Sequence, residues 1–238
     1  MKRFLKKIFY KFPSSYILMF HHIDDGRIIQ KSGCVLDYKA FLNIISSDVQ
    51  FTSVIDLIKN NIKYKVAITF DDGLKDVYRV AYPELKKRSI PFTLFVVTDF
   101  LDKEGYISTS ELIEMSKDPL VTVGSHGVTH KILKGMPVQE QIEELKCSKE
   151  ILEKIIDSEV EIFAYSHGQF DDNTIRLLKK YKFYKYIFGV SGLPLNFITK
   201  RYIYNLPRFN CENGNNYFQN KIIKIVLKEN KELKNEYL

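Results

Sequence analysis

The side chains best suited to catalysis are gathered in four short segments of this chain. All five histidines fall in residues 20–23, 125–130 and 166–168, while residues 69–73 place two adjacent carboxylates at the end of an apolar run. Imidazole is the commonest metal ligand among side chains and titrates nearest to neutral pH. Two histidines and a carboxylate leave metal positions open for water and substrate, and a further carboxylate and histidine can move protons. The pattern therefore predicts a metallohydrolase.

The two central motifs divide the chemistry between neighbouring residues. His126 and His130 stand four apart, so one helical turn would place both rings on the same face. Of the adjacent Asp71 and Asp72, one can ligate a metal while the other stays free as a base. Either motif alone is weak evidence, because Asp-Asp-Gly is also a common turn. The two motifs together, in this order, are specific.

Strand-like and helix-like segments alternate along the chain, which indicates βαβ units and a mostly parallel sheet in one domain. A basic segment, residues 1–15, precedes this domain, which is expected to span residues 16–238 and to end in a helix. Strands are predicted at 16–23, 65–70, 91–98, 120–124, 161–165, 184–190 and 202–206. Helices are predicted at 37–45, 76–88, 108–115, 138–156, 172–181 and 217–231.

Each of the four segments begins near the point where a predicted strand ends. In a (β/α) barrel the C-terminal ends of the strands converge on one face, and active sites form there. The polar residues at 21, 71–72, 126 and 167 would then lie together at the C-terminal face of the barrel. A plainer interpretation, that each polar residue only satisfies loop backbone, suits a single histidine better than the whole set.

The cysteine count and the net charge bear on the protein's cellular compartment and on its binding partners. The chain has 238 residues, a net charge of +7 and three widely spaced cysteines, Cys34, Cys147 and Cys211. An odd number of cysteines without C-x-x-C argues against a disulfide framework and suits a reducing compartment. The positive charge leaves a nucleic-acid-binding protein as an alternative, but the lysines are spread along helices rather than gathered on one surface.

The N-terminal segment is basic and aromatic, with no acidic residue before Asp24. The apolar stretch that follows is short and has no small-residue cleavage site, so no cleaved signal peptide is predicted. No apolar run is long enough to span a bilayer. We therefore expect a cytoplasmic protein, whose N-terminus either packs as a solvated helical turn or makes weak contact with the anionic inner face of the membrane.

The same segments resemble motifs of the polysaccharide deacetylases, the NodB-homology or carbohydrate esterase family 4 enzymes. Thr-Phe-Asp-Asp-Gly at 69–73 and Ser-His-Gly-Val-Thr-His at 125–130 resemble the first two motifs, and Phe-Ala-Tyr-Ser-His-Gly at 163–168 resembles a variant of the third. Phe-His-His-Ile at 20–23 is similar to the first strand of the branch that includes the poly-N-acetylglucosamine deacetylases. The resemblance spans residues 16–210. It implies a distorted (β/α)7 barrel that removes acetyl groups from N-acetylated or O-acetylated sugars.

The resemblance also implies a role for each matching residue. Asp72, His126 and His130 match the ligands of one divalent metal ion, for which Zn²⁺ is the first expectation and other divalent ions stay open. Asp71 matches the base that activates water, and His21 matches the general acid of the poly-N-acetylglucosamine branch. Hydrolysis of an amide or ester would pass through a tetrahedral intermediate.

The third motif departs from the family pattern. The backbone N–H of His167, which follows Ser166 in place of a proline, is expected to form part of the oxyanion site. Ala164 stands near the place of an arginine that holds the catalytic aspartate in the more widespread form of this motif. Arg208 either supplies the missing guanidinium from a later strand or is an ordinary surface arginine. His22 is expected to face away from the pocket.

The expected substrate is an N-acetylated sugar in a glycan or glycan precursor, and no nucleic acid. A degenerate family member that binds glycan without turnover is the alternative, motivated by Ala164 and by Ser166 with His167. The intact carboxylates and histidines of the first two motifs argue against it. The sequence leaves open the identity of the sugar, the preference for N-acetyl or O-acetyl groups, and the oligomeric state.

Overall fold

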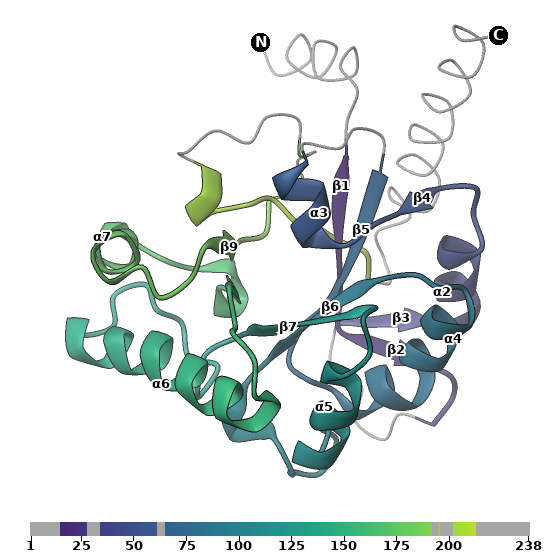
Figure 1. Cartoon of the computed structure of the whole chain (residues 1–238), viewed down its shortest axis with the longest axis horizontal. Coiled ribbons are helices and arrows are strands. Elements are labelled where there is room, and N and C mark those ends of the chain that lie inside the picture. Colours follow the sequence, from purple (N-terminus) through teal and green to yellow (C-terminus); the bar gives the residue numbers. More distant parts are fainter. Residues whose placement is uncertain (1–14, 28–33, 61–64, 192–194, 196–201, 213–238) are drawn as a thin grey trace, which may run out of the picture.

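The computed structural model describes residues 15–27, 34–60, 65–191, 195 and 202–212. Within these residues eight parallel strands form one curled sheet, with helices on its outer side (Figure 1). Seven strands make up the main path, and β4 (Gln50–Phe51) pairs with β5 beside it. In sheet order the seven are β10 (Phe209–Asn210), β1 (Tyr16–Phe20), β5 (Lys65–Phe70), β6 (Phe92–Val96), β7 (Val121–Ser125), β8 (Ile162–Ala164) and β9 (Tyr186–Phe188).

The segment just before β10 connects the two ends of this strand path. Leu206 forms a parallel bridge with Phe188 of β9, and the N–H of Gly189 donates to the Leu206 carbonyl at 2.9 Å. At the other side β10 pairs with β1, where Phe209 lies opposite Leu18. The fold is therefore the distorted (β/α)7 barrel that the sequence motifs implied.

The strands are apolar along their whole length because both of their faces are covered. All five residues of β1 and all five of β6 are buried, as expected for parallel strands between an interior and a layer of helices. Four phenylalanines pack ring against ring in the core, with neighbouring ring centroids 5.5 to 6.1 Å apart. They are Phe20, Phe41, Phe70 and Phe92.

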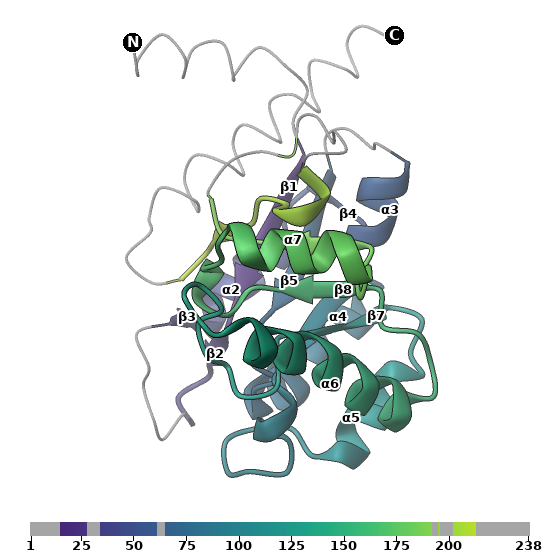
Figure 2. The same ribbon diagram turned by 90° about the vertical axis from the view of Figure 1, so that its left-hand side faces the viewer.

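The helices begin at local signals that the sequence carries. Ser108 caps α5 in a reciprocal capping box with Glu111, and Asp171 caps α7 in the same way with Thr174. Helices α6 and α7 lie side by side on the outside of the barrel (Figure 2). The α-helices of the described residues are α2 (Tyr38–Ile45), α3 (Val54–Lys59), α4 (Tyr82–Lys87), α5 (Thr109–Ser116), α6 (Val138–Ile156) and α7 (Asp172–Tyr181).

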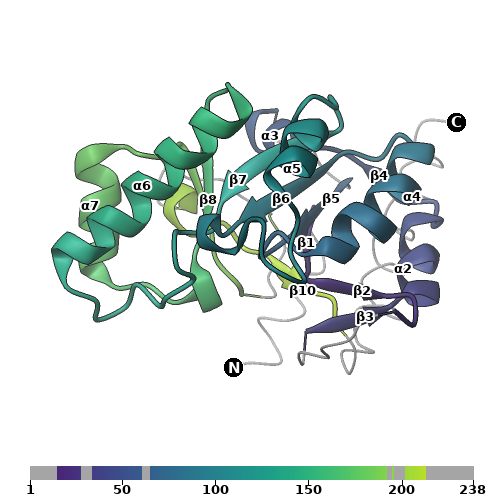
Figure 3. The same ribbon diagram turned by 90° about the horizontal axis from the view of Figure 1, so that it is seen from below.

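The strand predicted at 16–23 is interrupted at His21. It divides into β1 and a short β2 (His22–Asp24), which leaves the barrel and pairs with β3 (Val35–Asp37). Figure 3 shows this two-stranded sheet beside α2. The break matters for function, because it places His21 at the C-terminal end of a barrel strand.

The helix predicted at 76–88 is divided in the structure, and a proline explains the division. The helix predicted at 76–88 is a π-helical turn, η1 (Val77–Ala81), followed by α4, whose first turn contains Pro83. Proline has no N–H to donate within a helix, so the regular hydrogen-bond pattern is broken there.

Two 3-10 turns, η2 (Thr98–Phe100) and η3 (Ser166–Gly168), follow β6 and β8.

The prediction of a strand at 202–206 is wrong. A 3-10 turn, η4 (Tyr202–Tyr204), occupies most of this stretch, and the last strand starts only at Phe209. Pro207 lies between them, and it cannot donate to a strand ladder because it lacks an N–H.

Two predicted segments fall on parts of the chain that the structure does not describe. Residues 1–14 of the basic N-terminal segment and the helix predicted at 217–231 lie outside the described residues. Among the helices that are described, none combines the length and the apolar character needed to cross a membrane.

Candidate active site

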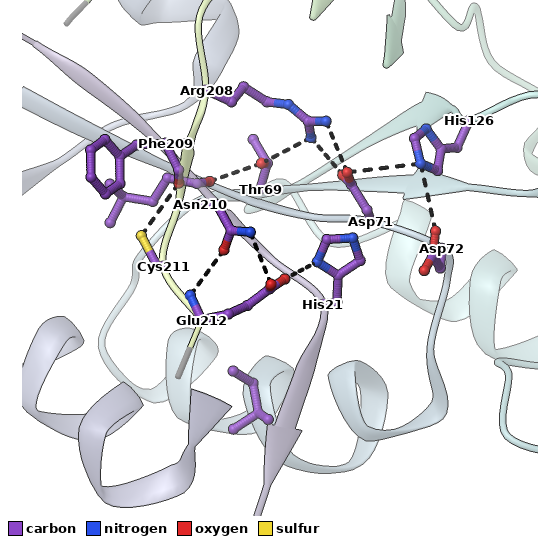
Figure 4. A network of polar contacts seen from close by, with 12 residues as sticks. His21, Thr69, Asp71, Asp72, His126, Arg208, Phe209, Asn210, Cys211 and Glu212 are labelled. Atoms are coloured by element: carbon purple, nitrogen blue, oxygen red, sulfur yellow. Dashed lines mark hydrogen bonds and ion pairs between the residues drawn. The ribbon is translucent and has the colours of Figure 1, made fainter. Parts of the chain in front are cut away.

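The polar segments meet at the C-terminal ends of the barrel strands, where the sequence placed them. His21 follows β1, Asp71 and Asp72 follow β5, and His126 follows the end of β7. Figure 4 shows these side chains turned toward one another, with Arg208 reaching in from the segment just before β10.

Asp72, His126 and His130 form a group that could hold a metal ion. The Nε2 atoms of His126 and His130 lie 3.5 and 3.3 Å from the same Oδ1 atom of Asp72. This oxygen is buried, and it makes no hydrogen bond within the described residues. Tetrahedral bonds of about 2.1 Å would place ligand atoms about 3.4 Å apart, which is close to both distances. The three side chains therefore fit a divalent ion.

The surroundings of the two histidines favour ligation through Nε2. His126 donates its Nδ1–H to the backbone carbonyl of Ala164 at 2.8 Å. This hydrogen bond fixes the orientation of the ring, so that Nε2 faces Asp72 and is free to bind a metal ion. Burial, followed by the neighbouring His126, lowers the pKa of His130 to about 4. The His130 ring is therefore neutral near pH 7, as a metal ligand must be.

The helical turn predicted from the spacing of His126 and His130 is wrong. The loop between them is a bend, because Gly127 and His130 have left-handed φ angles of 88° and 64°. The rings still meet, with centroids 5.0 Å apart. Asp72 and His167, with φ of 71° and 55°, are left-handed as well. Residues other than glycine rarely adopt this conformation, and such strain gathers at functional sites.

Glu144 of α6 contacts this loop, a role that sequence reasoning missed. Its carboxylate accepts hydrogen bonds from the N–H groups of Val128 at 2.7 Å and Thr129 at 3.1 Å. The Thr129 hydroxyl donates to the other carboxylate oxygen. A Cβ atom at Gly127 would lie 2.9 Å from Glu144 Oε2, so this close approach requires glycine.

Arg208 holds Asp71 in a buried, bidentate ion pair, which is the contact that the sequence analysis put forward. The two guanidinium nitrogens lie 2.5 and 2.8 Å from the two carboxylate oxygens of Asp71. Arg208 is fully buried, its Nε donates to the Gly189 carbonyl at 3.2 Å, and its guanidinium lies 5.0 Å from the centroid of the Phe95 ring. The interpretation of Arg208 as a surface residue is therefore wrong.

The ion pair keeps Asp71 charged. Burial by itself would raise the pKa of this carboxyl group, but the charge and the hydrogen bonds of Arg208 outweigh it and lower the pKa to about 2. Asp71 Oδ2 lies 3.8 Å from His126 Nε2, so the carboxylate is next to the metal-ligand group without belonging to it.

His21 is paired with Glu212, a second residue that sequence reasoning missed. The Nδ1 atom of His21 bonds to Glu212, whose carboxylate also accepts from the Asn210 amide at 2.9 Å. Burial lowers the pKa of His21, but the Glu212 hydrogen bond and the charges of Asp71 and Asp72 prevail, so the net pKa is raised. The other ring nitrogen lies on the side of Asp71 (Figure 4).

His22 has a different partner. Its Nδ1 lies 3.1 Å from Asp76, whose carboxylate also accepts the N–H of Ile23. These contacts hold β2 in place and leave His21 as the histidine of this pair that reaches the site.

Ser166 and His167 make the third segment part of the site. The Ser166 hydroxyl donates to the His126 carbonyl at 3.0 Å, and the His167 ring packs against the His130 ring with centroids 4.6 Å apart. The proposed part of the His167 N–H in an oxyanion site stays a prediction.

Comparison with known proteins relates this geometry to a family. A family model for polysaccharide deacetylases matches residues 59–186, which are 128 of the 238 residues. The chain belongs to the polysaccharide deacetylase family. The matched region contains Asp71 and the three metal-ligand candidates, whereas His21 and Arg208 lie outside it.

Individual relatives agree with this assignment. A Bacillus subtilis protein named as a polysaccharide deacetylase is 30% identical over 48% of this chain and 41% of its own length, so the match spans less than half of that protein. The poly-β-1,6-N-acetyl-D-glucosamine N-deacetylase of Staphylococcus aureus is 29% identical over 74% of this chain and 72% of its own length. A crystal structure of a polysaccharide deacetylase from Bacillus cereus has a TM-score of 0.74 and 26% identity, covering 90% of this chain and 69% of that one.

Proposed function

We propose that the chain is a metal-dependent hydrolase that removes acetyl groups from N-acetylated sugars. One observation carries the proposal: a carboxylate held charged by a buried arginine stands beside a convergent group of one carboxylate and two imidazoles. A fixed base next to a metal site is the arrangement that metal-assisted amide hydrolysis requires.

The proposed substrate is N-acetylglucosamine within a polymer or a glycan precursor. Family membership supports an acetylated carbohydrate. The name of the Staphylococcus aureus relative gives its substrate as poly-β-1,6-N-acetyl-D-glucosamine, and its similarity covers 74% of this chain.

The proposed ion is Zn²⁺, held by Asp72, His126 and His130. Two imidazoles with one carboxylate form a ligand set typical of catalytic zinc, and they leave a coordination position for water or substrate. When bound, such an ion would polarise the acetyl carbonyl and lower the pKa of water at the site.

Asp71 is proposed as the general base. Its low pKa keeps it ionised at neutral pH. The two hydrogen bonds from Arg208, one to each carboxylate oxygen, fix the orientation of the carboxylate. A base held in this way can take the proton of the attacking water without first reorienting.

His21 is proposed as the general acid. Because Glu212 occupies Nδ1, the proton for the leaving amine would come from the other ring nitrogen, on the side of Asp71. The raised pKa of His21 increases the fraction of the ring that carries this proton near neutral pH.

We further propose the organisation and location expected from the sequence. Residues 1–15 would form a basic segment in front of a single deacetylase domain, residues 16–238, in a cytoplasmic protein with weak contact to the inner membrane surface. Separating cells into soluble and membrane fractions at low and high salt would test this location.

Asp71→Asn tests the proposed reaction. The variant should keep its metal and lose about 100-fold or more in the rate of acetate release from N-acetylglucosamine oligomers, because general base catalysis contributes about that much. Asp99→Asn is the matched control, since Asp99 is exposed, and it should match the wild type. Oligomer binding without acetate release by the wild type would contradict the proposed hydrolase and favour the glycan-binding alternative.

The two adjacent histidines allow a second comparison. His21→Ala should lose activity to a similar extent, whereas His22→Ala should be milder, because His22 contacts Asp76 instead of the site. Equal, large losses in both variants would contradict the assignment of His21 as the acid.

A further inference from the structure

A second group of metal-binding side chains lies beside the proposed catalytic site. His21, Cys34 and Glu212 each offer one ligand atom, and these atoms lie within 4.8 Å of one another. None of the three belongs to the Asp72, His126 and His130 group. The proposed reaction uses His21 and its partner Glu212 but gives no task to Cys34.

Backbone pairing brings these three residues together from distant parts of the sequence. The N–H of His22 donates to the Cys34 carbonyl at 3.1 Å, so the thiol is held next to the end of β1. On the other side the N–H of Cys211 donates to the Met19 carbonyl at 3.1 Å, which fixes the start of the segment that carries Glu212. The cluster is therefore set by the strand register and not by a single flexible loop.

The donor atoms define the kind of ion that this cluster would prefer. A thiolate, an imidazole and a carboxylate together suit Zn²⁺ and softer ions better than Mg²⁺ or Ca²⁺. His21 and Glu212 have only 15% and 8% of their side-chain surface exposed, and Cys34 is half-buried. His21 and Glu212 are thus shielded from water on most sides, and three protein ligands leave a coordination position for a further ligand such as water.

We propose that His21, Cys34 and Glu212 form a second, thiolate-containing metal site, which takes up Zn²⁺ in excess of the catalytic ion and inhibits the enzyme. On binding, the Cys34 sulfur would lose its proton to solvent and form a bond to the ion, while the ion would replace the proton that His21 and Glu212 share.

The charges around Cys34 support a cation at this point. Burial, and then the negative charge of Glu212, raise the pKa of the Cys34 thiol to about 12, with further contributions from Asp72 and Asp71. Several carboxylates therefore surround the thiol, and a divalent ion there would be attracted by the same charges that oppose a free thiolate.

The inhibition follows from opposite demands on one imidazole. A general acid must carry the extra proton, whereas a metal ligand must be neutral with a free nitrogen. An ion bound to His21 would therefore prevent the ring from acting as the acid. This consequence rests on the proposed function, but the metal site itself does not.

Cobalt titration of the full chain would test the site directly. Co²⁺ bound by a thiolate gives a charge-transfer absorption that carboxylate and imidazole ligands alone do not give. The wild type should bind two ions per chain and develop this absorption with the second ion. Cys34→Ser and Cys34→Ala should each bind one ion and lack the absorption, while Cys147→Ser, on α6, should behave like the wild type.

Activity in excess Zn²⁺ provides the second measurement. Cys34→Ser should need at least about tenfold more Zn²⁺ than the wild type for half-inhibition. Mutating a residue that only hydrogen-bonds to a metal ligand already weakens metal affinity by about tenfold or more, and loss of a ligand itself should weaken it at least as much. Saturation of the wild type at one ion per chain, or an unchanged thiolate absorption in both Cys34 variants, would overturn the proposal. If no sugar is deacetylated, the proposed function fails, but the cobalt titration still decides the second site.

Discussion

The buried pair of Arg208 and Asp71 allows a quantitative test of how the base is held. Arg208→Lys keeps the charge but loses the planar fork whose two nitrogens reach Asp71 at 2.5 and 2.8 Å, and we expect the equivalent of one of these two hydrogen bonds to be lost. A hydrogen bond between charged groups contributes about 1.5–3 kcal/mol. Since about 1.4 kcal/mol corresponds to a tenfold change in rate, kcat/KM should fall roughly 10- to 100-fold.

The assay is acetate release at matched metal content, measured by elemental analysis of the same samples. Metal occupancy should stay unchanged, because Arg208 contacts the base and none of the three metal-ligand candidates. Arg88→Lys is the control, since Arg88 forms a partly exposed ion pair with Glu84 and should tolerate the change. A kcat/KM of Arg208→Lys within twofold of the wild type, or a loss explained by missing metal, would refute this reasoning.

Three further predictions concern the ligands and their supports. The double variant with His126→Ala and His130→Ala should lose the catalytic metal, and full metal content by elemental analysis would contradict the ligand assignment. Glu144→Gln should weaken metal affinity about 10- to 100-fold in a competition assay with a chelator, because it loosens the loop between the histidines. Glu212→Gln should lower the pKa of His21, whose acid form is lost as pH rises through that pKa. The basic limb of the kcat/KM profile should therefore move to lower pH, and an unmoved limb would exclude Glu212 as its partner.

Glu143 offers a matched control for the Glu144 experiment. It is the adjacent residue on α6, but it is exposed and accepts a hydrogen bond from Gln139. Glu143→Gln should therefore leave metal affinity unchanged. Equal affinities in the Glu143 and Glu144 variants would mean that the loop keeps its shape without the carboxylate.

The site residues that the sequence predicted are those placed by regular structure. Asp71, Asp72 and His126 follow apolar runs whose ends can be read from the sequence, and parallel strands bring such ends together. The contact between Arg208 and Asp71 was one of two alternatives for Arg208, although 137 positions separate the two residues, because the resemblance implied an arginine that the third motif lacks.

The residues that sequence reasoning missed act through contacts without a local pattern. Glu144 looks like an ordinary polar residue of an amphipathic helix, and only the fold shows that it is buried under the loop of Val128 and Thr129. Glu212 meets His21 across 191 positions, after a strand of two residues that is too short to recognise. The predicted helical turn is wrong for a related reason: Gly127 has a left-handed φ angle and lies close to Glu144, and neither feature has a pattern in the sequence.

Reconstitution of metal-free protein tests the central proposal most directly. The protein would be stripped with a chelator, and acetate release from β-1,6-linked N-acetylglucosamine oligomers would be followed while Zn²⁺ is added. We expect no release without metal, full activity near one ion per chain, and a decline when a second ion binds. Equal acetate release from stripped and reconstituted protein, with metal content verified in both, would contradict a metal-dependent deacetylase built on Asp72, His126 and His130.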